Sequence, residues 1–181
     1  MKVVSVNIGE KKTINYKGKI IETGIFKKPV NHPIFLGEED VENDAVIDRK
    51  YHGGIDQAVY AYSENHYAYW KELYPNLDWH YGMFGENLTI SNLEETKIQV
   101  GNIYRLGETI LEVTKSRTPC MKLGIVFGTQ KILKQFWNST KCGVYFKVIQ
   151  IGNVAANDKL ILITQSKKSP TIAAIYETKK S

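Results

Sequence analysis

The chain has 181 residues, of which 43% are hydrophobic and 24% are charged, so one folded domain with a substantial core is expected. The net charge of +5 is mild and comes with neither a basic stripe nor a nucleic-acid-binding motif, so a nucleic-acid partner is not expected. No signal-peptide segment and no run of membrane-helix length is found, which predicts a cytoplasmic protein without membrane contact.

Short segments rich in Val and Ile predict strands along most of the chain. They are expected at 2–9, 18–26, 57–62 and 86–90, in three short runs between 98 and 117, and at 143–152 and 159–164. Residues 27–46 contain two prolines and an acidic run, and we expect them to form an irregular loop.

Two helices are predicted between these strands. The first has Ser63 as its N-cap, apolar residues at helical spacing from Tyr67 onward, and Pro75 beyond its end. The second is capped by Thr129, and its apolar face carries Ile132, Leu133, Phe136 and Trp137. With no regular βαβ alternation, the pattern favours a mainly β fold, a closed or nearly closed β-barrel with a few peripheral helices.

The domain is predicted to span residues 1–164, because no internal repeat and no linker divides that part of the chain. Residues 165–181 are expected to form either one short helix or a frayed tail.

The sequence "YHGGIDQAVYAY" is the first candidate binding segment. His52 is followed by Gly53 and Gly54, and paired glycines allow close backbone approach to a ligand or exposed N–H groups around an anion. The alternative is an ordinary turn before a strand. A second segment, "YGMFGENLTI", places Asn87 after two glycines, and it is alternatively a loop that leads into a strand.

The third segment, "SRTPCMKLGIVFG", contains Cys120. In an extended chain Thr118, Cys120 and Lys122 share one side, and the nearby Arg117 and Lys122 would lower the thiol pKa and favour the thiolate. The alternative is a buried filler, since free cysteine is among the most buried residue types. Cys142 leads into a strongly apolar strand, so core packing is predicted for it. Both cysteines are expected to be free thiols.

Taken together, "HGGIDQAVYAY", "FGENLTI", "SRTPCMKL" and "GVYFKVIQIG", in this order, resemble the MOSC-domain family, named for the C-terminal domain of molybdenum-cofactor sulfurases. The chain is most similar to its small, stand-alone, bacterial YiiM-like branch, from about residue 1 to about residue 163. The resemblance implies a MOSC-type β-barrel and a pocket for the molybdenum cofactor, a molybdopterin that carries a phosphate.

The resemblance also assigns residues to the site. The family's cysteine falls on Cys120, as a molybdenum ligand in the reductase branch or a persulfide carrier in the sulfurase-linked branch. Positions expected to line the cofactor site are His52, Gly53, Gly54, Asn87 and Arg117, and Thr118 and Lys122 join them as neighbours of Cys120.

The sequence departs from the family pattern before "HGG", where it has Asn43–Asp44 and then Asp48, and at Cys142, where many relatives have threonine. The helical C-terminal extension of longer relatives is reduced to one expected helix.

Three functions compete. The first is a molybdenum-dependent reductase of N-hydroxylated small molecules such as hydroxylamino nucleobases, with electrons from an external flavodoxin, ferredoxin or cytochrome. The second is a sulfur carrier with a Cys120 persulfide, although nothing in the chain resembles a pyridoxal phosphate domain and that cofactor is not expected. The third is a non-catalytic module that binds the molybdenum cofactor.

Overall fold

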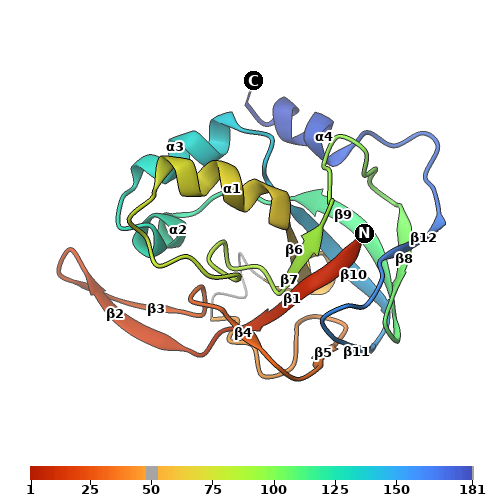
Figure 1. The fold of residues 1–181 in the computed structure, drawn as a ribbon, viewed down its shortest axis with the longest axis horizontal. Coiled ribbons are helices and arrows are strands. Elements are labelled where there is room, and N and C mark those ends of the chain that lie inside the picture. The colour runs from red at the N-terminus through yellow and green to blue at the C-terminus, as the bar shows by residue number, and fades with distance from the viewer. Residues whose placement is uncertain (48–52, 181) are drawn as a thin grey trace.

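The computed structural model describes residues 1–47 and 53–180 and is mainly β, with short helices at the periphery (Figure 1). Eight strands form the main sheet: β1 (Lys2–Ile8), β4 (Lys28–Val30), β6 (Val59–Ser63), β7 (Leu88–Ser91), β8 (Ile103–Leu106), β9 (Thr109–Ser116), β10 (Val144–Gln150) and β12 (Ile161–Thr164). Two small sheets pair β2 (Lys12–Tyr16) with β3 (Lys19–Thr23) and β5 (Ile34–Leu36) with β11 (Gly152–Val154).

The main sheet has the order β12-β8-β9-β10-β6-β7-β1-β4, and its neighbours are antiparallel except for the parallel pair β6 and β7. It curls back on itself, because the segment before β12 bonds to β1: the N–H of Val3 donates to the carbonyl of Asp158 at 2.9 Å. Among the described strands no ladder joins β12 to β4. The mainly β prediction is confirmed, and closure into a barrel stays a prediction.

Strand burial explains why the sheet forms where it does. Side chains of β9 and β10 alternate between buried and partly exposed, whereas all five residues of the central strand β6 are buried. The core beside β6 is aromatic: the rings of Tyr62 and Phe84 stack at 4.2 Å, and Trp70 Nε1 donates to the Tyr62 hydroxyl at 2.7 Å. The polar atoms of Tyr62 and Trp70 thus have each other as partners inside the core.

The α-helices are α1 (Glu64–Leu73), α2 (Met121–Val126), α3 (Lys131–Asn138) and α4 (Ile172–Thr178), with a 3₁₀ turn η1 (Ile55–Gln57). Those predicted after Ser63 and after Thr129 are confirmed as α1 and α3, and Trp70 and Phe136 stack between them at 6.1 Å. None of the helices in the described part of the chain is long and apolar enough to cross a membrane.

Of the two predicted N-caps, Ser63 is confirmed and Thr129 is wrong. Ser63 stands at the N-cap of α1, but its buried hydroxyl has no hydrogen-bond partner among the described residues. The N-cap of α3 is Gln130, and Thr129 accepts only the N–H of Lys131, at 3.3 Å. The tail forms the helical alternative, since α4 buries Tyr176 against the core.

Several predicted loops contain regular structure. Residues 27–46 include β4 and β5, and β2 occupies residues 12–16, where no strand was predicted. Conversely, residues 98–100 contribute only an isolated bridge between Gln99 and Thr171. Helix α2 was not predicted at all, and it begins at the residue after Cys120.

Candidate functional site

A pocket lies beside β6, where several separate segments of the chain meet. Its described lining residues are Thr23, Gly24, Ile25, Lys27, Asp44, Ala45, Val46, Ile47, Gly53, Gln57, Ala58, Tyr60, Gly85, Asn87, Arg117, Cys120, Lys122 and Tyr145. The pocket therefore brings together parts of all three motif segments identified in the sequence.

Only some of the predicted site residues line the pocket. Those that line the pocket are Gly53, Asn87, Arg117, Cys120 and Lys122. Gly54 and Thr118 are outside the lining, and His52 lies outside the described residues.

Arg117 is a buried cation in this pocket. Only 5% of the residue is exposed, and its guanidinium lies 4.9 Å from the centre of the Tyr60 ring. Its Nη1 is buried and has no hydrogen-bond partner among the described residues. Because a buried donor without an acceptor is costly, this nitrogen marks where an acceptor on a ligand would be favourable.

Cys120 is the N-cap residue of α2 and is partly exposed to the pocket. Its backbone is extended, with φ −123° and ψ 164°, but Lys122 is already helical. The predicted extended run from Thr118 to Lys122 is therefore wrong, because a helix begins at Met121, directly after Cys120. Arg117 is nevertheless close enough to couple electrostatically to Cys120.

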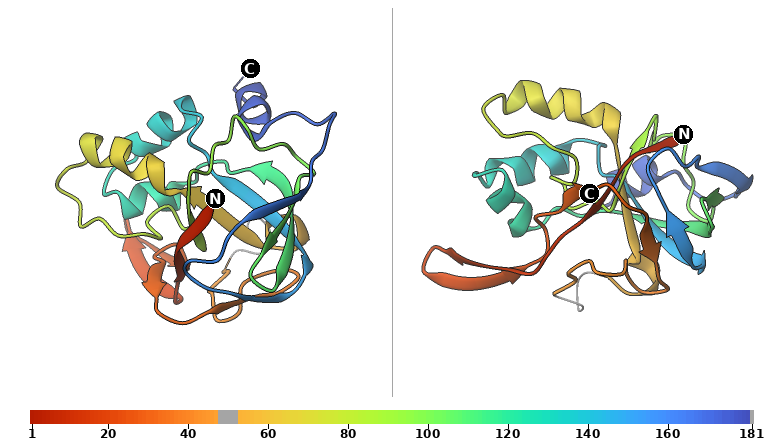
Figure 2. Two further views of the ribbon diagram at one scale, coloured as in Figure 1. Left: turned by 45° about the vertical axis from the view of Figure 1, so that its right-hand side comes forward. Right: turned by 60° about the horizontal axis from the view of Figure 1, so that its bottom comes forward.

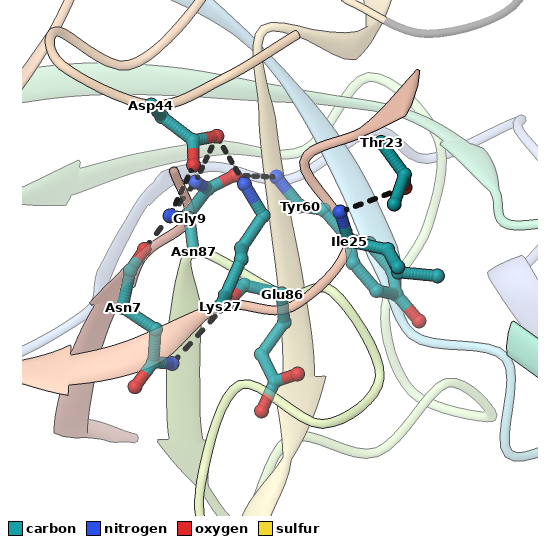
Figure 3. Close-up of polar contacts among 9 residues, drawn as sticks. All are labelled: Asn7, Gly9, Thr23, Ile25, Lys27, Asp44, Tyr60, Glu86 and Asn87. Carbon is teal, nitrogen blue, oxygen red and sulfur yellow. Dashed lines mark hydrogen bonds and ion pairs between the residues drawn. The ribbon is translucent and has the colours of Figure 1, made fainter. Parts of the chain in front are cut away.

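Lys27 and Asp44 also line the pocket and form a buried ion pair (Figure 3). The second oxygen of Asp44 accepts the N–H of Gly9 at 2.8 Å, and the amide of Asn87 donates to the oxygen bound by Lys27 at 3.0 Å. Burial lowers the pKa of the Lys27 ammonium, and the Asp44 carboxylate opposes that shift. The pair fixes the segment around Asp44 against the strands beneath it.

Asn87 is held as part of the wall by the same network. Besides Asp44, its side chain contacts the backbone of Tyr60, whose N–H donates to Oδ1 at 3.4 Å. Its own N–H donates to the Tyr60 carbonyl at 2.9 Å. These bonds lead to neighbouring strands, so Asn87 ties the pocket wall together instead of closing a local turn.

Glu86 organises the loop that precedes Asn87. Its carboxylate is fully buried and accepts the N–H groups of Gly82 at 2.8 Å and Phe84 at 3.1 Å, as well as the hydroxyls of Thr89 and Tyr67. Burial raises the pKa of this carboxyl, and the donated hydrogen bonds act in the opposite direction. The loop that presents Gly85 to the pocket is thus folded around one carboxylate.

We expect Glu86→Gln to lower the free energy of unfolding by about 1–3 kcal/mol, the usual cost of leaving buried donors unsatisfied. The amide nitrogen of glutamine cannot accept the N–H that now points to Oε2, and it would oppose another donor there. Chemical denaturation of the purified protein measures the difference. The control is Glu94→Gln on the surface, which removes only an exposed pair with Lys97 and should change little. Equal stability of the two variants would contradict the role given to Glu86.

Two glycines are required by the shape of the pocket. Gly53 has φ +75°, and a Cβ there would lie 2.9 Å from the side chain of Val46. Gly85 has φ +74°, and its Cβ would lie 3.2 Å from Ile25 and 3.8 Å from Arg117 Nη1. Both positions combine a left-handed backbone with close neighbours, so side chains are excluded from them.

Sequence reasoning missed the wall formed by Lys27, Asp44, Tyr60 and Tyr145. Lys27 and Asp44 fall in what was predicted to be an irregular loop, and no motif links residues 17 positions apart. A buried lysine is rare unless it is paired, but Lys27 is followed by the exposed Lys28, so nothing local in the sequence marks it as buried. In the described part of the chain, no group of three or more His, Cys, Asp and Glu side chains could hold a metal ion.

Comparisons of the sequence and of the structure with known proteins relate the chain to the same family. Residues 48–161 match the MOSC domain. The chain is 35% identical to the Bacillus subtilis protein YflK over 170 residues, which cover 94% of this chain and 76% of YflK. It is 32% identical over 149 residues to a Gibberella moniliformis protein named reductase, covering 81% of this chain and only 26% of that protein. The crystal structure of YiiM from Geobacillus stearothermophilus superposes with a TM-score of 0.81 at 32% identity, covering 98% of this chain and 83% of that one.

Proposed function

The chain belongs to the MOSC-domain family, in its YiiM- and YflK-like stand-alone branch, and we propose that it binds the molybdenum cofactor and reduces N-hydroxylated small molecules. The observation that carries this proposal is the buried, unpartnered Nη1 of Arg117 in the same pocket as the partly exposed Cys120. A reductase among the relatives supports the oxidoreductase class.

The residues present fit such a cofactor. Arg117 would donate to its anionic group, because a guanidinium offers several N–H groups in a planar arrangement that matches a phosphate. Cys120 would supply a thiolate, which is a soft ligand for the metal. The cofactor itself would provide the other ligands of that metal. The glycine positions 53 and 85 leave room for the cofactor to approach the backbone.

When bound, the cofactor would supply two-electron redox chemistry at its metal. The protein's part is to hold it and to shape the space beside it. Lys27, Asp44 and Asn87 hold one another in place through an ion pair and a hydrogen bond. This part of the pocket can therefore position a substrate without rearranging. Apolar side chains of Val46, Ile47 and Ala58 line another part of the pocket and suit the flat body of a hydroxylamino base.

Protein purified from cells that make the cofactor tests the proposal. We expect one molybdenum per chain, and reduction of a hydroxylamino purine when a reduced viologen dye supplies electrons. Molybdenum without turnover would instead support a cofactor-binding module, and a persulfide on Cys120 without metal would support a sulfur carrier.

NAD(P)H alone is expected to give no turnover with the isolated chain. No glycine-rich dinucleotide motif is present, and two cysteines are too few for an iron–sulfur cluster. A spectrophotometric assay with dye in one sample and NAD(P)H in another makes the comparison. Rapid oxidation of NAD(P)H by the pure protein would show that an internal electron-transfer site exists.

A further inference from the structure

The hairpin formed by β2 and β3 projects from the body of the protein (Figures 1 and 2). Its two strands pair only with each other, from Lys12 opposite Thr23 to Tyr16 opposite Lys19. A hairpin of this size is marginally stable by itself. None of residues 12–22 contributes to the hydrophobic core, which suggests a role outside it.

One face of the hairpin has the composition of a docking surface. Side chains alternate between faces along each strand, so Ile14 and Tyr16 of β2 share a face with Ile21 of β3. Lys12 and Lys19 are exposed at opposite ends of that same face. An apolar centre with charged groups around it is typical of protein–protein interfaces.

The hairpin is also basic. Residues 10–22 contain four lysines and two glutamates, and Glu22 already pairs with Lys11 at 2.7 Å. Lys12, Lys17 and Lys19 form no salt bridge to a described residue. Lys28, which is exposed in the strand that follows, adds a further positive charge beside the hairpin.

The base of the hairpin leads directly into the pocket. Thr23 ends β3 on the same face as Lys12, and Thr23, Gly24, Ile25 and Lys27 line the pocket. The N–H of Ile25 donates to Thr23 Oγ1 at 3.2 Å, which keeps the short connection compact. A protein seated on this face would therefore lie beside the mouth of the cofactor site.

We propose that the β2–β3 hairpin is the docking arm for a small, acidic redox protein that delivers electrons to the pocket. The inference rests on the proposed reductase function. Reduction of a hydroxylamino group to an amino group takes two electrons and two protons and releases one water. A one-electron donor must therefore dock and be oxidised twice per turnover, so a small and rapidly dissociating interface is required.

The test compares two double charge reversals. Lys12→Glu with Lys19→Glu changes the hairpin face, and Lys167→Glu with Lys168→Glu makes the same change of net charge on the exposed segment before α4. Each protein is assayed with reduced viologen dye and with two reduced acidic donors, a flavodoxin and a plant-type ferredoxin. Binding of each donor is measured in parallel by NMR titration at low and high salt.

We expect the hairpin variant to lose about tenfold or more of its donor-driven rate at low ionic strength, because steering by opposite charge accelerates encounter by such factors. Its dye-driven rate should stay at the wild-type level, and its remaining donor-driven rate should depend less on salt. The Lys167 and Lys168 variant should behave like the wild type in every assay.

Equal losses in both variants, or no loss in the hairpin variant, would overturn the docking assignment, as would the failure of both donors to bind the wild type. A dye-driven rate that falls with the hairpin changes would also overturn it, since the hairpin would then act on the pocket itself. If the wild type has no dye-driven turnover, the proposed function fails. The NMR titration still decides whether the hairpin binds an acidic redox protein.

Discussion

Cys120→Ser is expected to abolish retention of molybdenum and catalytic turnover while leaving the fold intact. The thiol is partly exposed in the pocket and is not part of the core, so removing its sulfur should cost little stability. A hydroxyl cannot replace a thiolate as a soft metal ligand. Metal content by mass spectrometry, dye-driven activity and the melting temperature measure the three quantities separately.

Cys142→Ala is the matched control. Cys142 is fully buried, and burial raises the pKa of its thiol far from the range in which a thiolate forms. The backbone carbonyl of Cys142 accepts the Tyr60 hydroxyl at 2.8 Å, and alanine preserves this bond. We expect a loss of roughly 1 kcal/mol in stability with metal content unchanged. Equal loss of molybdenum in both variants, with native folding, would remove Cys120 from its assigned role.

The different positions of the two cysteines could be predicted from sequence because the flanking residues differ. The apolar "CGVYF" segment carries Cys142 into the core, as predicted, and Cys120 of the polar "SRTPCMK" segment lines the pocket. Strands such as β9 and β10 were equally predictable, since β-branched, aromatic and other apolar residues are concentrated in them. Local composition decides these features.

Other features depend on contacts between residues distant in the sequence, so the local sequence does not predict them. Helix α2 has six residues, includes Gly124, and begins two residues after Pro119, so its helical pattern is too short to detect. Strand β2 is polar, and it is a strand because β3 pairs with it. The ion pair of Lys27 with Asp44 exists only once the chain has folded.

Arg117→Met is expected to separate the stability of the empty protein from its affinity for the cofactor. In the cofactor-free protein the guanidinium is buried with an unsatisfied N–H, so its removal should leave the free energy of unfolding unchanged or raise it by about 1–3 kcal/mol. Methionine keeps an apolar stem against Tyr60 and Phe136, over whose rings the guanidinium now lies at 4.9 and 5.9 Å. Loss of a charged hydrogen bond to the cofactor should weaken its retention by roughly 10- to 100-fold.

Arg105→Met is the control for Arg117→Met, because Arg105 is exposed on β8, away from the pocket lining, and undergoes the same substitution. Thermal unfolding is measured for each protein without cofactor and after purification from cells that make it. The wild type and Arg105→Met should gain stability when loaded, whereas Arg117→Met should gain little because it retains little cofactor. A large loss of stability in the empty Arg117→Met protein would show that the arginine supports the fold, since removing an unpaired buried donor cannot by itself destabilise it. Undiminished retention of cofactor in that variant would show instead that the unpartnered nitrogen does not face the ligand.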